Sequence, residues 1–253
     1  MSNKNAFTFA SVSFANAVPF THFLPSVCPG SRSVFDPPAK LADLLLKGVV
    51  DAALIPVVDL FLNPSLRVLD DIGISASGAT TSTLIKCYRP LSEVNIVMKD
   101  RRSSTSNVLA AILFEKQLNV AVTMEEFCEG KDVDAEIVIG DRALCLDPAP
   151  FGDYDLSEEW LDMTGLPFVF AVWACRNDCP HSNELSLILH NSLDKGQGHI
   201  DEIAAIQAER LSLPIEQCRE YLSDIIRYRL GDNELKGMEL FRTMVQEYRE
   251  AGL

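Results

Sequence analysis

Short apolar runs alternate with amphipathic stretches through much of the chain, and glycine and proline mark many of the joins. The first three stretches are AFTFASVSF (6–14), AKLADLLLKGVV (39–50) and DAALIPVVDL (51–60). In the second stretch, apolar side chains recur at steps of three and four residues from Leu41 to Val49. This spacing predicts one apolar face of a helix that ends near Gly48. Strands that alternate with helices are typical of α/β proteins, so we expect this helix to lie against a sheet.

The alternation continues to about residue 174, and the remainder has a helical pattern. Ser82–Cys87 is predicted to be a strand, and EIVIGDRAL (136–144) a strand that enters a turn. Phe168–Ala174 is almost entirely apolar, which predicts a fully buried strand. Glu184–Leu253 is predicted to be helical, with breaks at its glycine and proline positions. Two α/β halves with a helical tail could form one doubly wound sheet or two lobes, because periodicity gives no strand order.

The charge of the chain favours a small-molecule ligand. There are 36 acidic and 22 basic residues, which gives a net charge of −14. This field repels nucleic acid and anionic membrane surfaces, so we expect no nucleic acid and no membrane as partner. Backbone N–H groups can still hold an anion on an acidic protein. The sequence leaves open whether the protein is a monomer or a homodimer.

The start of the chain, MSNKNAFTFASVSFANAVPF, lacks a long apolar region followed by a cleavage site. No later stretch stays apolar for the roughly 18 residues that a membrane span requires. We therefore expect a cytoplasmic protein. The seven cysteines are scattered, and Cys175 and Cys179 do not form a CxxC pair, so reduced and mostly buried thiols are expected.

The common catalytic signatures are missing from the sequence. It contains no GxGxxG, GxxxxGK[ST], GxSxG or HExxH, and no cysteines and histidines at the spacing of metal ligands. There are four histidines, and His181, His190 and His199 lie in or near the helical tail. Surface or capping roles are expected for these and for His22, so the sequence gives little support to a histidine-driven mechanism.

Hydroxyl, amide and glycine positions at the ends of predicted elements remain as candidates. Asn16 follows the first strand and precedes Pro19, which suits the first turn of a helix; ligands bind at such strand ends in open α/β sheets. Gly78–Ser82 offers hydroxyls at a strand entry, and Ser103–Ser106 offers a helix start that can bind a carboxylate. At Gly140–Asp141, the glycine permits close backbone approach, and the aspartate could cap a helix or orient a ligand hydroxyl. Ordinary turns and caps are the alternative for every one of these segments.

Taken together, these segments resemble the chorismate dehydratases of menaquinone biosynthesis, in the futalosine pathway. The resemblance is carried by SVSFANAVPF (11–20), DAALIPVVDL (51–60), Gly78–Ser82, Ser103–Ser106, IGDRAL (139–144) and WLDMTGLPFVFAVWA (160–174). Its most specific part is TGLPFVFAVWA, and GHIDEIAAIQAERLSLP and YLSDIIRYRL are similar to the helical C-terminal region of that family. The resemblance therefore runs nearly from end to end.

The resemblance implies an α/β fold with two lobes, similar to the type II periplasmic binding proteins, with a ligand cleft between the lobes. On this template, residues 1–83 and 175–253 form the first lobe, and residues 84–174 form the second. The chain would cross between them near Ser82 and again within 168–174.

The implied reaction is a hydro-lyase reaction, the loss of water from chorismate to give 3-[(1-carboxyvinyl)oxy]benzoate, with neither a cofactor nor a metal. Because the product is aromatic, the protein need only hold the substrate, assist removal of the ring proton and stabilise the departing hydroxide. No strong protein base stands in the motif, which favours the side-chain carboxylate of the substrate as base. Asn16 and Ser82 are implied as catalytic residues. The substrate-binding residues implied are Ser103, Ser104, Thr105, Ser106, Gly140 and Asp141.

The chain departs from the family pattern at Arg101 and Arg102, where small or hydroxyl-bearing residues are more frequent. Arg101 could add a charge contact or point to solvent, and solvent is favoured. One alternative function is the dihydroxynaphthoate synthase of the same pathway, but its family starts with a Ser-Pro-Cys-Pro-Asn type of motif, whereas this chain has SFANAVPF. Another alternative is a non-catalytic cytoplasmic solute-binding protein, because a fold does not determine function; the missing export signal argues against a receptor.

Overall fold

The computed structural model describes residues 6–128 and 130–250, which form two compact units. Unit 1 comprises the chain up to Ile74 together with Ala171–Leu230. Unit 2 comprises Ser75–Phe170 together with the chain from Gly231 on. The chain therefore passes from one unit to the other three times.

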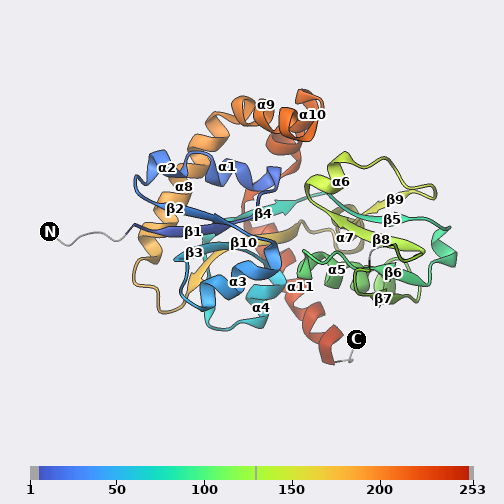
Figure 1. The fold of residues 1–253 in the computed structure, drawn as a ribbon. Coiled ribbons are helices and arrows are strands. Elements are labelled where there is room, and N and C mark those ends of the chain that lie inside the picture. Colours follow the sequence, from blue (N-terminus) through green and yellow to red (C-terminus); the bar gives the residue numbers. More distant parts are fainter. Residues whose placement is uncertain (1–5, 129, 251–253) are drawn as a thin grey trace. The chain divides into compact units, whose positions relative to one another are not determined.

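Unit 1 is built on a six-stranded sheet with the strand order β11-β4-β10-β3-β1-β2 (Figure 1). Its strands are β1 (Thr8–Ser11), β2 (Arg32–Phe35), β3 (Ala52–Pro56), β4 (Leu66–Ala76), β10 (Phe168–Arg176) and β11 (Arg227–Arg229). Its helices are α1 (Val18–Thr21), α2 (Leu24–Val27), α3 (Pro38–Leu46), α4 (Val57–Leu62), α8 (Ser182–Gly198), α9 (Ile200–Leu211) and α10 (Ile215–Glu220). Strand β1 pairs in parallel with β2 and β3, whereas β10 runs antiparallel to β3. The predicted α/β architecture is confirmed.

The helix predicted between residues 41 and 49 is α3. Leu41 and Leu45 are fully buried, and the turn that ends the helix contains Gly48 with a φ of 67°. A glycine adopts this left-handed conformation without steric cost, which confirms the predicted end. The prediction for Val49 is wrong: its side chain is 58% exposed, because the helix stops at Leu46 and the helical spacing no longer applies.

Unit 2 is built on a five-stranded sheet with the strand order β7-β6-β8-β5-β9 (Figure 1). Its strands are β5 (Thr83–Cys87), β6 (Ile96–Met98), β7 (Thr123–Glu125), β8 (Ala135–Ile139) and β9 (Asp153–Asp155). Its helices are α5 (Ser104–Lys116), α6 (Asp141–Cys145), α7 (Leu156–Thr164) and α11 (Asp232–Glu250). Strand β6 is parallel to β7 and β8, and β5 is antiparallel to β8 and β9. The two parallel strands β6 and β8 are each followed by a helix, α5 after β6 and α6 after β8.

The last part of the chain differs from the prediction. The lobe boundaries at residues 83, 84, 174 and 175 assign the whole tail to one lobe, but the chain from Gly231 on, with α11, clusters with unit 2. Phe241 of α11 packs edge-on against Trp160 and Phe168, at centroid distances of 5.7 and 4.9 Å. A Cβ at Gly237 would collide with the carbonyl oxygen of Pro167, so only glycine permits this close approach. Among the described residues no helix, α11 included, is long and apolar enough to cross a membrane.

The predicted buried strand at residues 168–174 is present within β10, with one exception. Trp173 is fully buried and contacts Phe9 and Phe20 edge-on, at centroid distances of 6.3 and 5.8 Å. Phe170 and Ala171 are only half-buried, so the prediction of complete burial is wrong at these two positions. They are the residues at which the chain leaves unit 2 and enters unit 1.

All seven cysteines are free thiols, as expected. Cys87, Cys175 and Cys218 are buried, but Cys128 and Cys145 are exposed, so the expectation of mostly buried thiols holds only in part. Burial, assisted by the negative charge of Asp153, raises the pKa of Cys87 to about 11. At neutral pH this thiol stays protonated and behaves as a small apolar side chain.

Candidate functional site

Asn16 lies just beyond the carboxyl end of β1, in a 3₁₀ turn (Ala15–Ala17) that leads into α1. Its Oδ1 is buried and makes no hydrogen bond with any residue that the structure describes. The oxygen therefore caps neither the turn nor α1, so the alternative of an ordinary turn or cap does not apply to it. The hydroxyl of Ser11, the last residue of β1, is buried and unpartnered in the same sense. A buried polar atom without a partner costs about 1–3 kcal/mol, so these two atoms at the end of β1 are candidates for contact with a ligand.

The segment Gly78–Ser82 in unit 2 is held by a buried carboxylate. Oδ2 of Asp155 accepts hydrogen bonds from the backbone N–H groups of Thr80 (2.8 Å) and Thr81 (2.7 Å) and from Oγ1 of Thr80 (3.1 Å). Its Oδ1 accepts from two N–H groups in the first turn of α7, at 2.9 and 3.3 Å. Burial raises the pKa of the Asp155 carboxyl, and the backbone donors act in the opposite direction. These bonds also hold Thr81 at a φ of 58°, a conformation that β-branched residues rarely adopt.

Ser82 and Gly140 are neighbours in unit 2. The carbonyl oxygen of Ser82 accepts a hydrogen bond from the Gly140 N–H at 2.7 Å, next to the point where Thr83 pairs with Ile139. Gly140 has φ 64° and ψ −145°, a backbone conformation that favours glycine at this corner. The cap suggested for Asp141 is wrong: the N-cap of α6 is Gly140, and Asp141 is the first helical residue.

The predicted helix start at residues 103–106 is confirmed. Ser103 is the N-cap of α5, and its Oγ accepts a hydrogen bond from the Ser106 N–H at 3.0 Å. The hydroxyls of Ser103 and Ser106 are also bonded to each other, at 2.9 Å. Ser103, Thr105 and Ser106 are buried and Ser104 is half-buried. The capping alternative is therefore correct for Ser103, and the remaining N–H groups and the positive dipole end of this 13-residue helix are suited to an anion.

Arg102 and Asp100 form a brace beside this helix start. Nε and Nη2 of Arg102 bind the two carboxylate oxygens of Asp100 at 3.0 and 2.7 Å, and the side chain of Asp100 is only 4% exposed. Nη2 of Arg102 also donates to the carbonyl oxygen of Ile139 at 3.2 Å. The pKa of Arg102 is raised, mainly by its hydrogen bond to Asp100. The brace therefore joins the loop before α5 to the end of β8, just before Gly140.

Asn107 holds the same loop from the other side. Its Oδ1 accepts from the backbone N–H of Asp100 at 3.0 Å, and its Nδ2 donates to the Asp100 carbonyl oxygen at 2.9 Å. The neighbouring Arg101 is exposed, as expected. The structure thus brings Ser82, Gly140 and the start of α5 into one region of unit 2, whereas Asn16 belongs to unit 1.

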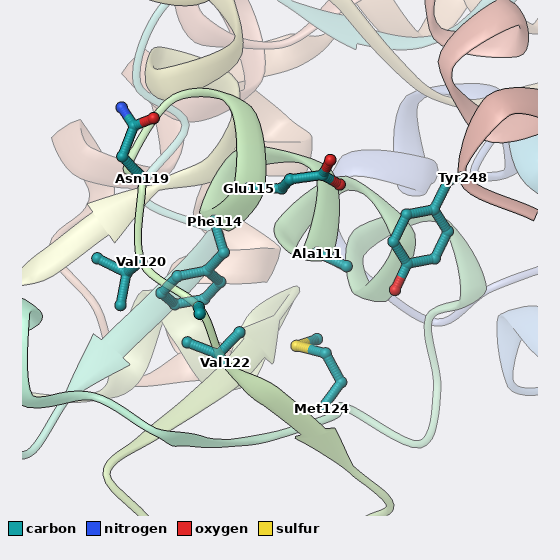
Figure 2. Close-up of a pocket in the computed structure, with 9 residues that line it drawn as sticks. Ala111, Phe114, Glu115, Asn119, Val120, Val122, Met124 and Tyr248 are labelled. Carbon is teal, nitrogen blue, oxygen red and sulfur yellow. The ribbon is translucent and has the colours of Figure 1, made fainter. Parts of the chain in front are cut away.

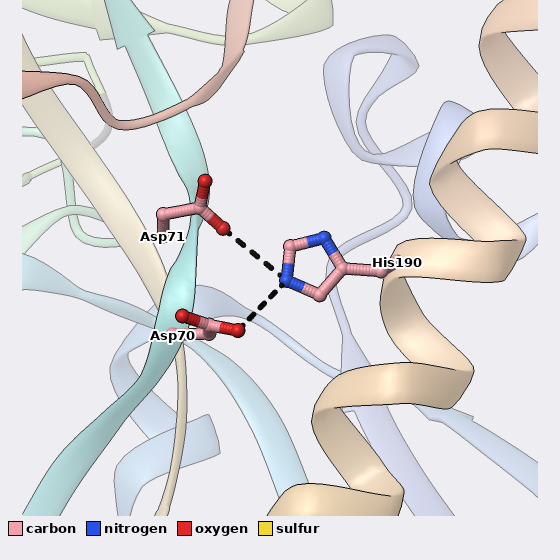
Figure 3. Close-up of side chains that lie close together, drawn as sticks. All are labelled: Asp70, Asp71 and His190. Carbon is pink, nitrogen blue, oxygen red and sulfur yellow. Dashed lines mark hydrogen bonds and ion pairs between the residues drawn. The ribbon is translucent and has the colours of Figure 1, made fainter.

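Among the described residues, His190 forms a cluster of possible metal ligands with Asp70 and Asp71 (Figure 3). Its Nε2 lies 3.3 Å from Oδ2 of Asp70 and 3.2 Å from Oδ1 of Asp71. On the other side of the ring, Arg229 Nη1 lies 2.8 Å from Nδ1. Since a guanidinium can only donate, Nδ1 is the acceptor and Nε2 carries the proton, so no lone pair faces the two carboxylates. We therefore assign this cluster as a hydrogen-bond network of unit 1, which agrees with the surface role expected for the histidines.

Unit 2 also contains an apolar pocket of about 440 Å³ near the end of α5 (Figure 2). It is lined by Ala111, Phe114, Glu115, Asn119, Val120, Ala121, Val122, Met124 and Tyr248. None of the predicted site residues is among them. The pocket and the predicted site are therefore separate features of unit 2.

A family model described as menaquinone biosynthesis matches residues 7–247. The chain belongs to this family. A protein of Thermus thermophilus named chorismate dehydratase is 30% identical over 250 residues, which cover 90% of this chain and 91% of the relative. A Campylobacter jejuni protein of the same name is 29% identical over 208 residues, 81% of this chain and 79% of the relative.

The fold of this menaquinone-biosynthesis family member is similar to that of the periplasmic binding proteins. The periplasmic aliphatic sulphonate binding protein of Escherichia coli matches with a TM-score of 0.66 at 12% identity, over 98% of this chain and 94% of the other. At this identity the likeness shows the fold alone. The two-lobed, periplasmic-binding-protein-like α/β fold expected from the sequence is confirmed.

Sequence reasoning missed several polar residues that shape the site of this family member. Asp155 could have been found, because Asp155 and Glu158 have the spacing of a helix-capping signature. The Asp100–Arg102 brace gave no such signal, because its second contact, the Ile139 carbonyl, is distant in sequence. Ser11 was overlooked as well, since nothing in a sequence marks a buried hydroxyl that lacks a partner.

Replacing Arg102 by lysine tests the brace. Lysine keeps the positive charge but cannot make the two-pronged bond to Asp100 together with the bond to Ile139. We expect the KM for the substrate to rise by about tenfold with a smaller change in kcat, because about 1.4 kcal/mol of hydrogen bonding to a charged group is lost. Arg89→Lys is the matched control, since Arg89 pairs with Asp134 in the same unit. Equal KM values for both variants and the wild type would show that the brace has no part in substrate binding.

Proposed function

We propose that the protein is a chorismate dehydratase, a hydro-lyase that removes water from chorismate to give 3-[(1-carboxyvinyl)oxy]benzoate. The observation that carries the proposal is the relative of this name, which is 30% identical over 90% of this chain. The family match over residues 7–247 supports the same pathway. In the reaction one ring C–H bond and one ring C–O bond break, and the proton and hydroxide leave together as water.

The roles of the residues are part of this proposal. Asn16 and Ser82 act on the reacting ring, as hydrogen-bond donors or orienting groups. The buried, unpartnered Oδ1 of Asn16 supports this role, because it can receive a hydrogen bond from the substrate and so orient its ring. The buried position of Ser82 beside Gly140 supports a fixed placement of its hydroxyl.

The start of α5 holds a carboxylate of chorismate through Ser103, Ser104, Thr105 and Ser106. In support of this, the helix presents N–H groups and a positive dipole end, and the brace keeps its first turn beside β8. Gly140 and Asp141 line the wall next to Ser82. The substrate's own side-chain carboxylate takes the ring proton, which is consistent with a site of amide and hydroxyl groups.

Two alanine substitutions test the carboxylate site. Ser103→Ala and Ser106→Ala are each expected to weaken chorismate binding by about 1–3 kcal/mol, the range for hydrogen bonds to a charged group. Isothermal titration calorimetry gives the dissociation constants. Ser223→Ala is the control, because that hydroxyl is exposed and bonds only to residues near the end of α10. Unchanged dissociation constants in the first two variants would limit these hydroxyls to capping α5.

A binding measurement combined with product analysis separates this function from that of a solute receptor. Chorismate is incubated with the purified protein, and bound ligand and product are quantified by dialysis and chromatography. The proposal predicts that product accumulates beyond one equivalent of protein. Tight binding without product would favour a receptor, and the absence of binding would contradict both functions. The cytoplasmic location and the choice between monomer and homodimer stay predictions, to be checked by cell fractionation and light scattering.

A further inference from the structure

A second pocket in unit 2 gathers three arginines in a protein whose net charge is −14. Its volume is about 410 Å³, a size that suits a small organic molecule. It is lined by Met98, Asp100, Arg101, Arg102, Phe127, Cys128, Gly130, Glu136, Ile137 and Arg142. The catalytic and substrate-binding residues proposed above are not among these, although Asp100 and Arg102 of the brace are.

Two of the three arginines are already neutralised by carboxylates. Arg102 binds Asp100 as described, and Nη2 of Arg142 donates to both carboxylate oxygens of Glu136, at 3.2 and 3.1 Å. Glu136 also accepts a hydrogen bond from the hydroxyl of Tyr88 at 2.5 Å. Each of these two arginines is therefore held by a carboxylate, and each arginine–carboxylate pair has no net charge.

Arg101 differs from the other two. Within the described part of the chain, its guanidinium has no carboxylate partner; it lies over the ring of Phe127, 5.2 Å from the centroid. Phe127 is 37% exposed and Arg101 is exposed as well, so both side chains are accessible from solvent. Among the lining residues that the structure describes, one positive charge is therefore uncompensated, beside an accessible aromatic ring.

The other lining groups restrict the ligand further. Met98 and Ile137 are apolar side chains that favour an apolar body. Because Asp100 and Glu136 are paired with Arg102 and Arg142, the charge left among the described lining residues is that of Arg101, which matches a ligand with one negative charge better than a polyphosphate. A cationic ligand would meet Arg101.

We propose that this pocket binds a small aromatic monocarboxylate. Its carboxylate pairs with the guanidinium of Arg101, and its ring packs on Phe127 and the neighbouring apolar side chains. A guanidinium that lies over an aromatic ring still has N–H groups that can donate to a carboxylate. The proposal does not rest on the proposed function, because its contacts are made by Arg101 and Phe127, which have no role in that function, and it can be measured without chorismate.

Titration of the full-length protein with benzoate, followed by calorimetry or ligand-observed NMR, tests the proposal. We expect saturable binding with a dissociation constant of about 1 mM, as is ordinary for a ligand of this size. Benzamide, which has the same shape without the charge, should bind at least about tenfold more weakly. Arg101→Gln should weaken benzoate binding by about tenfold, and Phe127→Leu should weaken it several-fold.

Two controls make the test specific. Arg89→Gln removes an arginine of unit 2 that does not line the pocket, and should leave benzoate binding unchanged. Ser106→Ala should also leave it unchanged, because it alters the start of α5 instead. The proposal is overturned if benzoate does not saturate, if Arg101→Gln binds it like the wild type, or if Ser106→Ala abolishes its binding.

Discussion

Replacing Asn16 by alanine is expected to lower the turnover of chorismate by about 10²–10³-fold, the effect typical of removing one group that polarises a reacting centre. The amide oxygen of Asn16 has no hydrogen-bond partner among the described residues, so the substitution removes no structural bond. The free energy of unfolding should therefore change by less than about 1 kcal/mol. Steady-state kinetics and a denaturant titration of the same preparation measure both quantities.

Asn63→Ala is the matched control for Asn16→Ala. Asn63 is also a half-buried asparagine of unit 1, but its Nδ2 donates to the carbonyl oxygen of Asp59 at 2.6 Å. Its replacement should lower stability by about 1 kcal/mol and leave turnover unchanged. If Asn16→Ala kept the turnover of the wild type, Asn16 would have no part in the mechanism.

Replacing Asp155 by alanine is expected to have the largest effect on stability. The substitution removes the N-cap of α7, worth about 1 kcal/mol, and leaves the N–H groups of Thr80 and Thr81 without their acceptor. We expect the free energy of unfolding to fall by about 3 kcal/mol. Turnover of the folded fraction should fall as well, because the segment that ends at Ser82 is no longer held.

Two further variants separate the effect of losing the hydrogen bonds of Asp155 from the effect of losing a negative charge. Asp162→Asn alters an exposed carboxylate on the same helix and should change stability by less than about 0.5 kcal/mol. Asp155→Asn keeps one acceptor but points an amide NH₂ at donors, so it should recover only part of the loss. If Asp155→Ala unfolded at the same denaturant concentration as the wild type, its hydrogen bonds would contribute nothing to the fold.

Regular patterns in the sequence predicted the elements and local caps well. The spacing of apolar residues placed α3, the hydroxyl-rich stretch placed the start of α5, and Gly140 marked a corner, where the structure adds a positive φ. Each of these features depends on neighbours within a few residues along the chain. Such short-range interactions leave a direct trace in the order of amino acids.

Features that depend on distant parts of the chain were not predictable from these patterns. The assignment of α11 to unit 2 depends on Phe241 meeting Trp160 and Phe168, and the brace depends on Arg102 reaching the Ile139 carbonyl. The unpartnered Oδ1 of Asn16 is a third example, because the sequence does not show which hydrogen bonds a side chain lacks. Its role came from the resemblance to a family, and the structure adds a physical reason for it.

The most direct test of the central claim is to follow chorismate and its product by mass spectrometry after adding the purified protein. The account predicts that the wild-type protein converts chorismate, over many turnovers and without an added cofactor, into an aromatic product lighter by one molecule of water. Asn16→Ala, folded to the same extent, should form this product at a small fraction of that rate. Persistence of chorismate at the rate of the protein-free control, with correctly folded wild-type protein, would contradict the proposed function.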